Sequence, residues 1–163
     1  MSITPHNLTI RRAELNDLLA IREIDQHLFG DESYPVFVLR QFLDITNGLV
    51  KVAVLADETV GYTIGHYNQE TAEAWMLSLG VLPNHRGKQI GQKLQQELIT
   101  DVAEKGASKI MLTVHPRNAS AIRIYEKAGF IKSETKEDYY LDGSPRLLMV
   151  KKLGSFGVRD FRS

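Results

Sequence analysis

One loop determines how this sequence is interpreted, and it reads Val81-Leu82-Pro83-Asn84-His85-Arg86-Gly87-Lys88-Gln89-Ile90-Gly91. Residues 73–81 before it have the apolar character of a strand, which Pro83 prevents from continuing. After it, apolar residues recur every fourth position from Ile90 to Val102, and Gly106 follows as a C-terminal cap. The pattern predicts a strand at residues 73–81, a loop after it, and a helix over about residues 90–105.

A loop in this place is suited to bind an anion. The first N–H groups of a helix have no intrahelical acceptor, and the positive end of the helix dipole lies behind them. Glycines allow close approach, and Arg86 and Lys88 add positive charge. The stretch matches neither the P-loop nor the dinucleotide fingerprint. On spacing alone, a pyrophosphate site and a merely solvated turn are equally good interpretations.

The remaining pattern predicts a single domain, residues 1–163, with a loose tail after about residue 153. Strands are expected at 8–11, 49–55, 60–67, 73–81, 109–114, 130–134 and 146–152, and helices at 16–28, 36–43, 90–105 and 118–128. Antiparallel strands followed by strand–helix–strand units indicate an α/β fold, with a mixed sheet and helices on both faces.

Composition argues against several function classes. The 163 residues carry 20 basic and 20 acidic side chains, so no net charge favours nucleic acid. No stretch has the length and apolarity of a membrane span. There is no cysteine, and the five histidines are not paired at helical spacing, so we expect no metal site. A cytoplasmic protein, monomeric or homodimeric, is the expectation.

Two segments resemble signatures of the GNAT superfamily of N-acetyltransferases. Residues 86–91 resemble its Arg/Gln-x-x-Gly-x-Gly/Ala loop, and residues 118–130, NASAIRIYEKAGF, resemble its second signature. The likeness covers nearly the whole chain and is strongest to ribosomal-protein alanine and N-terminal protein acetyltransferases. It implies a GNAT fold, mostly antiparallel with a splayed central strand pair, and transfer of acetyl from acetyl-CoA to a primary amine.

The resemblance also implies the residues that bind acetyl-CoA. Backbone groups of one strand would pair with the pantetheine arm, the strand near Val114 would splay away, and the loop would hold the pyrophosphate. Asn118 would cap its helix or contact the cofactor. The implied set is Leu79, Gly80, Val81, Arg86, Gly87, Lys88, Gln89, Ile90, Gly91, Asn118 and Tyr125. Gln89 replaces the middle glycine of the loop, which a glutamine tolerates where φ is negative.

Tyr125 is the implied catalytic acid, because a phenol near the departing CoA thiolate can protonate it. Relatives place a glutamate or histidine base at the position of Thr113, and neither Thr113 nor Trp75 can take a proton. His115 lies two residues beyond Thr113 and is therefore expected on the same face of the strand, which makes it the nearest titratable candidate. Its alternative is an ordinary loop-edge histidine. Glu73 is a remoter candidate.

The acceptor pocket is expected at three tyrosines. Tyr34 would form one wall. Tyr139 and Tyr140 are expected on a hairpin, where strand alternation turns one inward and one outward, and they would cover the substrate or pack across strands. The missing base favours an N-terminal α-amine, whose pKa is about 7.7–8.0, over a lysine amine near 10.4. Two alternatives stay open: an acetyltransferase for a polyamine, aminoglycoside or amino acid, and a non-catalytic acyl-CoA sensor.

Overall fold

The computed structural model describes residues 7–154, so the predicted loose tail lies almost wholly outside the described residues. The chain divides into two compact units. The first comprises residues 7–66 and 78–101, and the second comprises residues 67–77 and 102–154. Seven strands follow the hydrogen-bonded order β1-β2-β3-β4-β5-β7-β6. The predicted order of elements along the chain is confirmed.

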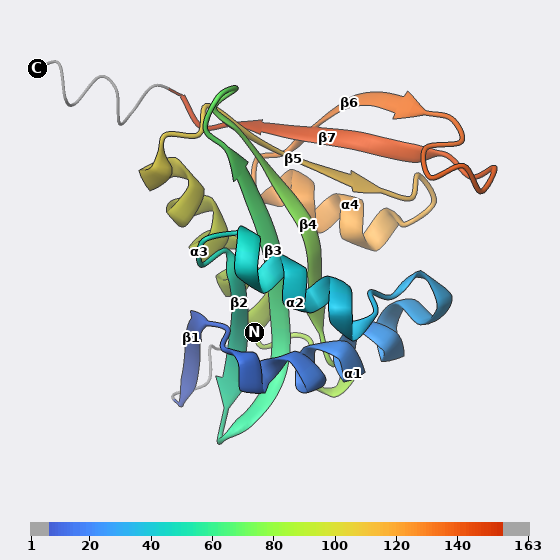
Figure 1. The fold of residues 1–163 in the computed structure, drawn as a ribbon. Coiled ribbons are helices and arrows are strands. Elements are labelled where there is room, and N and C mark those ends of the chain that lie inside the picture. Colours follow the sequence, from blue (N-terminus) through green and yellow to red (C-terminus); the bar gives the residue numbers. More distant parts are fainter. Residues whose placement is uncertain (1–6, 155–163) are drawn as a thin grey trace, which may run out of the picture. The chain divides into compact units, whose positions relative to one another are not determined.

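The first unit contains most of the helices (Figure 1). Its elements are β1 (Leu8–Arg12), α1 (Leu18–Phe29), α2 (Val36–Ile45), β2 (Val50–Leu55), β3 (Glu58–Asn68), the second half of β4 (Glu73–Val81) and most of α3 (Ile90–Lys105). Strands β1, β2 and β3 pair in antiparallel order. The turn between β2 and β3 has positive φ at Ala56 and Asp57, as a two-residue hairpin requires.

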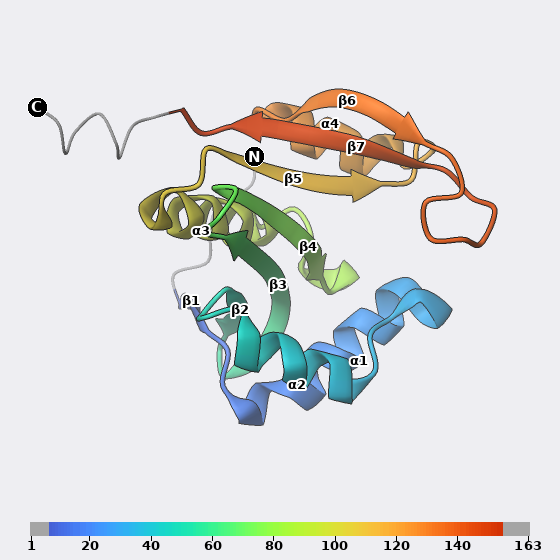
Figure 2. The same cartoon turned by 45° about the horizontal axis from the view of Figure 1, so that its top comes forward.

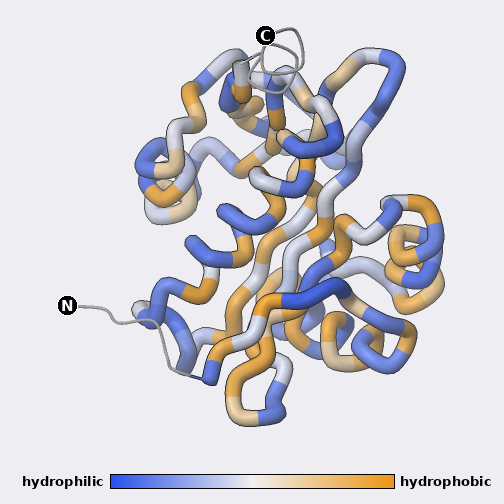
Figure 3. The backbone as a smooth tube through the Cα atoms, turned by 90° about the vertical axis from the view of Figure 1, so that its left-hand side faces the viewer, coloured by the Kyte–Doolittle hydropathy of each residue, from blue (hydrophilic) through white to orange (hydrophobic). Residues whose placement is uncertain are grey.

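The core of this unit has two sides. Ile21 of α1 and Leu39 of α2 pack with Val52, Tyr62 and Ile64 of the strands, all 1% exposed or less. Ala53 and Val60 instead pack with Ile90 and Leu94 of α3. A register shift at Ala53/Val54 moves Val60 onto the α3 side, although it has the same parity as Tyr62. Figure 3 shows hydrophobic residues concentrated along strands and alternating with hydrophilic ones along helices.

The second unit is a smaller sheet with one helix. It contains the first half of β4, the end of α3, β5 (Lys109–Val114), α4 (Ala119–Lys127), β6 (Ile131–Lys136) and β7 (Arg146–Lys152). β4 pairs with β5 in parallel at Glu73, Ala74 and Trp75, whereas β5–β7 and β6–β7 are antiparallel. Helix α4 lies along one face of these strands (Figure 2). The predicted α/β class with a mixed, mostly antiparallel sheet is confirmed.

Among residues 7–154, no helix has the length and apolar character needed to cross a membrane. Within the same residues, no group of three or more histidine, aspartate or glutamate side chains is placed to hold a metal ion.

Candidate active site

The loop at residues 82–91 has the shape expected of an anion site. A short 3-10 turn, Pro83–His85, leads into Gly87, whose φ is +81°. A Cβ built at Gly87 meets no atom within 4 Å, and one at Gly91 meets only Val81, at 3.6 Å. Packing within the protein therefore does not require glycine at either position. Open space at Gly87, just before a helix N-terminus, fits the close approach of a phosphate.

Gln89 differs from its sequence-based expectation. We expected glutamine to be tolerated there at negative φ, but its φ is +63°. An L-residue with a side chain adopts this left-handed region at a cost of about 1 kcal/mol or more. The backbone thus keeps the conformation that a glycine would adopt, and the glutamine bears the strain. Binding of a pyrophosphate by this loop stays a prediction.

The basic residues of the loop are placed differently from one another. Arg86 is exposed, whereas Lys88 is partly buried and its Nζ lies 3.2 Å from Nδ1 of His85. Nε2 of that histidine lies 4.0 Å from Glu58. Lys88 is thus held against the loop itself, and Arg86 is the loop cation that extends into solvent.

Gly80, expected at the pantetheine arm, is required by packing. A Cβ at this position would lie 2.7 Å from Cε1 of Tyr62 and 2.8 Å from Cδ1 of Leu28. These contacts are far inside van der Waals range, so the Tyr62 ring occupies the space of a side chain. Leu79 and Val81 flank Gly80 on β4 and are partly buried.

Tyr34 is fixed between α1 and α2. Its backbone N–H donates to Oδ2 of Asp25 at 2.6 Å, and its ring packs edge-on against Phe42 with centroids 5.1 Å apart. The structure therefore explains the position of Tyr34 through a buried carboxylate on the preceding helix.

Two residues of the first unit form a buried polar cluster that was not predicted from the sequence. Asp25 is 1% exposed and Tyr62 is 0% exposed, and the Tyr62 hydroxyl donates to Oδ1 of Asp25. The Tyr62 hydroxyl also lies 2.9 Å from Oγ of Ser78 on β4. A signal was available: Asp25 stands four residues after Ile21, on the apolar stripe of α1, where a charge is unusual.

Helix α4 in the second unit carries Asn118 and Tyr125. Oδ1 of Asn118 accepts from the backbone N–H of Ala121 at 3.2 Å, so the capping role is observed. Tyr125 is partly buried with its ring edge-on to Phe130, at a centroid distance of 5.9 Å. Burial raises the pKa of Tyr125 to about 12. The phenol therefore keeps its proton near neutral pH, which suits an acid and not a base.

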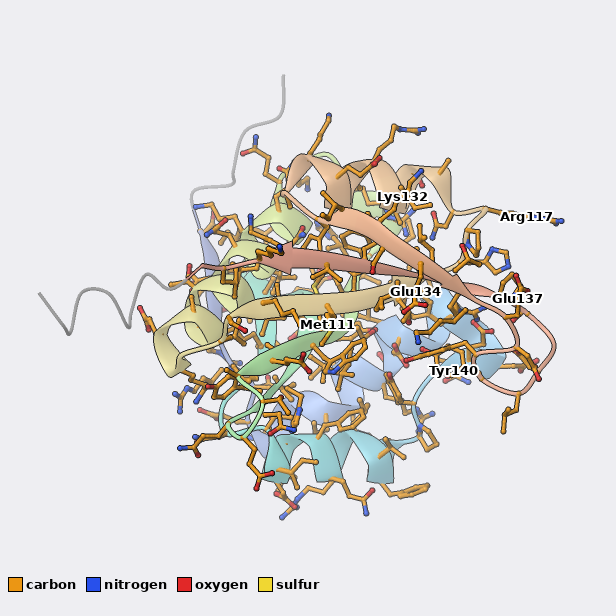
Figure 4. The ribbon with its side chains drawn as sticks, turned by 90° about the horizontal axis from the view of Figure 1, so that it is seen from above. Met111, Arg117, Lys132, Glu134, Glu137 and Tyr140 are labelled. Atoms are coloured by element: carbon orange, nitrogen blue, oxygen red, sulfur yellow. The ribbon has the colours of Figure 1, made fainter. Side chains whose placement is uncertain are left out.

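His115 lies beyond the end of its strand, so the expected alternation from Thr113 does not reach it. β5 ends at Val114, and Nδ1 of His115 accepts from the Arg117 N–H at 3.1 Å while its carbonyl accepts from the Asn118 N–H at 2.9 Å. In Figure 4, the Arg117 side chain extends outward from the connection between β5 and α4. Because Nδ1 accepts, Nε2 carries the hydrogen of the neutral ring and can only donate to a further partner. A role for His115 as base stays a prediction.

Tyr139 and Tyr140 lie in the loop between β6 and β7 and not on a strand, so strand alternation does not place them. The β6 strand ends at Lys136, and Asp138 and Leu141 have positive φ. The two rings meet edge-on at 4.8 Å. Figure 4 shows Tyr140 in this part of the second unit.

Tyr140 is held in place from two directions. Its hydroxyl lies 3.1 Å from Oγ1 of Thr113, and the Arg146 guanidinium lies over its ring at 5.1 Å from the centroid. Arg146 is itself buried and donates to Ser144 Oγ and to the Pro145 carbonyl. The position at which relatives were expected to carry a base is thus half of a hydroxyl pair.

A family model described as the acetyltransferase (GNAT) family matches residues 16–130. The chain belongs to this family. Members transfer acetyl from acetyl-CoA to an amine nitrogen, so the protein is an enzyme with acetyl-CoA as its co-substrate. Both expected signatures, at residues 86–91 and 118–130, lie inside the matched range, and the second ends at its last residue.

Similar proteins agree with this assignment to the GNAT family. An N-alpha-acetyltransferase of Saccharolobus solfataricus is 28% identical over 158 residues, which cover 90% of this chain and 94% of that protein. The crystal structure of Ard1 from Thermoplasma volcanium has a TM-score of 0.83 at 24% identity and covers 90% of this chain and 97% of Ard1. A chain of the NatC complex bound to Gag peptide and CoA has a TM-score of 0.81 at 21% identity, over 90% of this chain and 99% of the other. The two solved structures show that the GNAT fold is shared.

Proposed function

We propose that this GNAT enzyme acetylates the α-amine of a protein or peptide N-terminus. The observation that carries the proposal is the pair of Thr113 and Tyr140, whose hydroxyl oxygens lie 3.1 Å apart where relatives were expected to have a base. A threonine hydroxyl does not remove a proton from an ammonium ion near pH 7. The acceptor favoured by such a site is an amine that is already partly neutral.

The pKa values of amines separate the two main acceptor classes. An α-amine with a pKa of about 7.7–8.0 is neutral far more often at pH 7 than a lysine amine with a pKa of about 10.4, by roughly 300-fold. This ratio is a property of the amines themselves, so the enzyme needs no strong base to obtain the neutral α-amine. The name of the archaeal relative, an N-alpha-acetyltransferase, supports the same acceptor class.

Residues of both units have roles in the proposal. In the first unit, backbone N–H groups at residues 86–91 bind the pyrophosphate of acetyl-CoA, and the role of Tyr34 as a pocket wall stays a prediction. In the second, Tyr125 keeps a proton for the thiolate, and the loop with Tyr139 and Tyr140 contacts the acceptor. Acetyl-CoA supplies the activated acyl group, and the protein binds and orients the two substrates and moves the proton.

The test measures acetyl-CoA-dependent thiol release with a panel of acceptors. The panel contains a peptide with a free N-terminus and no lysine, the same peptide with a blocked N-terminus and one internal lysine, and spermidine. We expect turnover of the first and little or none of the others. Faster turnover of the lysine peptide would refute the proposal, and faster turnover of spermidine would favour a small-molecule acceptor.

A further inference from the structure

The buried cluster of the first unit runs through four elements. Asp25 is on α1, Tyr34 precedes α2, Tyr62 is on β3 and Ser78 is on β4. Asp25 and Tyr62 are buried, whereas Ser78 is partly exposed. A chain of hydrogen bonds thus leads from the buried carboxylate of Asp25 to the hydroxyl of Ser78 on β4. Ser78 is followed on this strand by Leu79 and Gly80.

The donors in this chain have a fixed direction. Both oxygens of Asp25 accept, one from the Tyr34 N–H and the other from the Tyr62 hydroxyl. Tyr62 has only one hydroxyl hydrogen, so the contact of 2.9 Å with Ser78 must use the hydrogen of Ser78. The Ser78 oxygen then has lone pairs, and no hydrogen, for any further partner. Asp25 therefore makes Ser78 a hydrogen-bond acceptor.

Stability alone does not account for a carboxylate at this position. None of the ion pairs recorded among residues 7–154 includes Asp25. Burying a charge without an opposite charge is costly, and an uncharged amide of the same shape would fill the site at lower cost. Burial, together with the hydrogen bond to Asp25, raises the pKa of Tyr62 well above its usual value, so the phenol keeps the hydrogen that it donates.

We propose that Ser78, Tyr62 and Asp25 form a proton-accepting chain for the amine, in place of the base that Thr113 does not provide. The inference rests on the proposed function only in requiring an amine acceptor. An N–H bond of the attacking amine breaks as an O–H bond forms at Ser78. The hydrogen of Ser78 passes to Tyr62 and that of Tyr62 to Asp25, which becomes a neutral acid. Tyr125 protonates the departing thiolate and takes a proton back from solvent, while the reverse transfers release the proton of Asp25 to solvent at Ser78, so the sequence balances.

The first test is Asp25→Asn. The introduced amide can accept from the Tyr34 N–H through its oxygen and donate to Tyr62 through its nitrogen. The bond from Tyr34 therefore persists unchanged, and the two bonds that link residue 25, Tyr62 and Ser78 persist with their direction reversed. We expect kcat to fall by about 10- to 100-fold, while the Tm stays level or rises because a buried charge is removed. A structural role alone predicts no loss of kcat in a folded variant, and a loss of kcat that only follows a fall in Tm would overturn the proposal.

The second test removes the accepting end of the chain with Ser78→Ala. Its matched control is Thr63→Val, because Oγ1 of Thr63 donates to the backbone carbonyl of the same Ser78 at 2.9 Å but is outside the chain. We expect S78A to lose kcat by a similar factor with CoA affinity unchanged, and T63V to keep wild-type kcat. The double variant D25N/S78A should be no slower than the slower single variant, because members of one chain are not additive. Wild-type kcat in S78A would overturn the proposal.

The acceptor for these assays is the amine on which the wild-type enzyme turns over fastest. If that amine is spermidine, the N-terminal acceptor is wrong, and the same variants still test the chain. If it is a peptide α-amine and S78A is as fast as the wild type, the N-terminal acceptor stands and the chain is wrong.

Discussion

Gly87→Ala tests whether the loop at residues 82–91 binds the pyrophosphate. The φ of Gly87 is +81°, and the open space around its Cβ position removes any steric clash with the protein. The folded state therefore bears only the conformational cost of alanine in the left-handed region, about 1–2 kcal/mol. Alanine also reduces the entropy of the unfolded chain, which offsets about 0.4–1 kcal/mol. The net loss should be about 1 kcal/mol, a Tm decrease of about 2–4 °C.

Gly143→Ala is the matched control. Gly143 has a φ of +83°, with no atom within 4 Å of its Cβ position, but it lies in the loop between β6 and β7. The two variants should lose the same stability. Only G87A should lose CoA affinity, because its methyl group stands where a phosphate would approach. Loss of one charge-assisted hydrogen bond is worth about 1.5–3 kcal/mol, which raises the Kd by roughly 10- to 100-fold.

The assay combines thermal unfolding without ligand and calorimetric titration with CoA. Equal Tm shifts and a selective increase in the Kd of G87A would support the reasoning. The same Kd for G87A and G143A would show that the loop does not contact the pyrophosphate, whatever the stabilities.

The remaining predictions concern separate parts of the chain. Gln89→Gly should raise the Tm slightly or leave it level, because relief of strain exceeds or matches the added unfolded-state entropy, and calorimetry should show CoA binding at least as tight. Tyr125→Phe should lower kcat by about 10- to 100-fold with the Kd for CoA unchanged. Because burial raises the pKa of Tyr125 to about 12, kcat of the wild type should show no loss from ionisation of this phenol below about pH 10. Thr113→Val removes a hydrogen bond to the β6–β7 loop and should raise the KM for the amine more than it lowers kcat, which steady-state kinetics would separate. Asp17→Asn tests a pH effect. Two hydrogen bonds from Arg11 lower the pKa of Asp17 below its usual 3.8, so the carboxylate stabilises the folded state at neutral pH. In urea unfolding, the wild type should have the larger free energy of unfolding at neutral pH, and the difference should shrink as pH falls below about 4 and approach zero below the folded pKa.

Local patterns placed most of the elements. The helix at Ile90–Lys105 and the strands at Glu73–Val81, Lys109–Val114 and Arg146–Lys152 have the predicted bounds, because apolar periodicity is a local signal. Pro83 and Gly106 each lie within two residues of the end of one of these elements. The loop at residues 86–91 and the cap at Asn118 were also readable, since each is a short-range backbone arrangement.

Sequence reasoning failed where a position depends on chain geometry outside a regular element. His115 and Tyr140 were assigned by strand alternation, but both follow the end of a strand, where the period of two no longer holds. The sign of φ at Gln89 was likewise not readable, because a glutamine gives no sign that the backbone is left-handed.

The sequence by itself determined the family, the order of the elements and the position of the glycine-containing loop at residues 82–91, because these follow from periodicity and from residues adjacent in the chain. Only the tertiary structure joined Asp25 to Tyr62, 37 residues away, and Tyr62 to Ser78, 16 residues further on. It also paired Thr113 with Tyr140, across 27 residues. Hydrogen bonds between distant segments depend on packing that no local pattern encodes, and the chemistry proposed for this enzyme depends on these bonds.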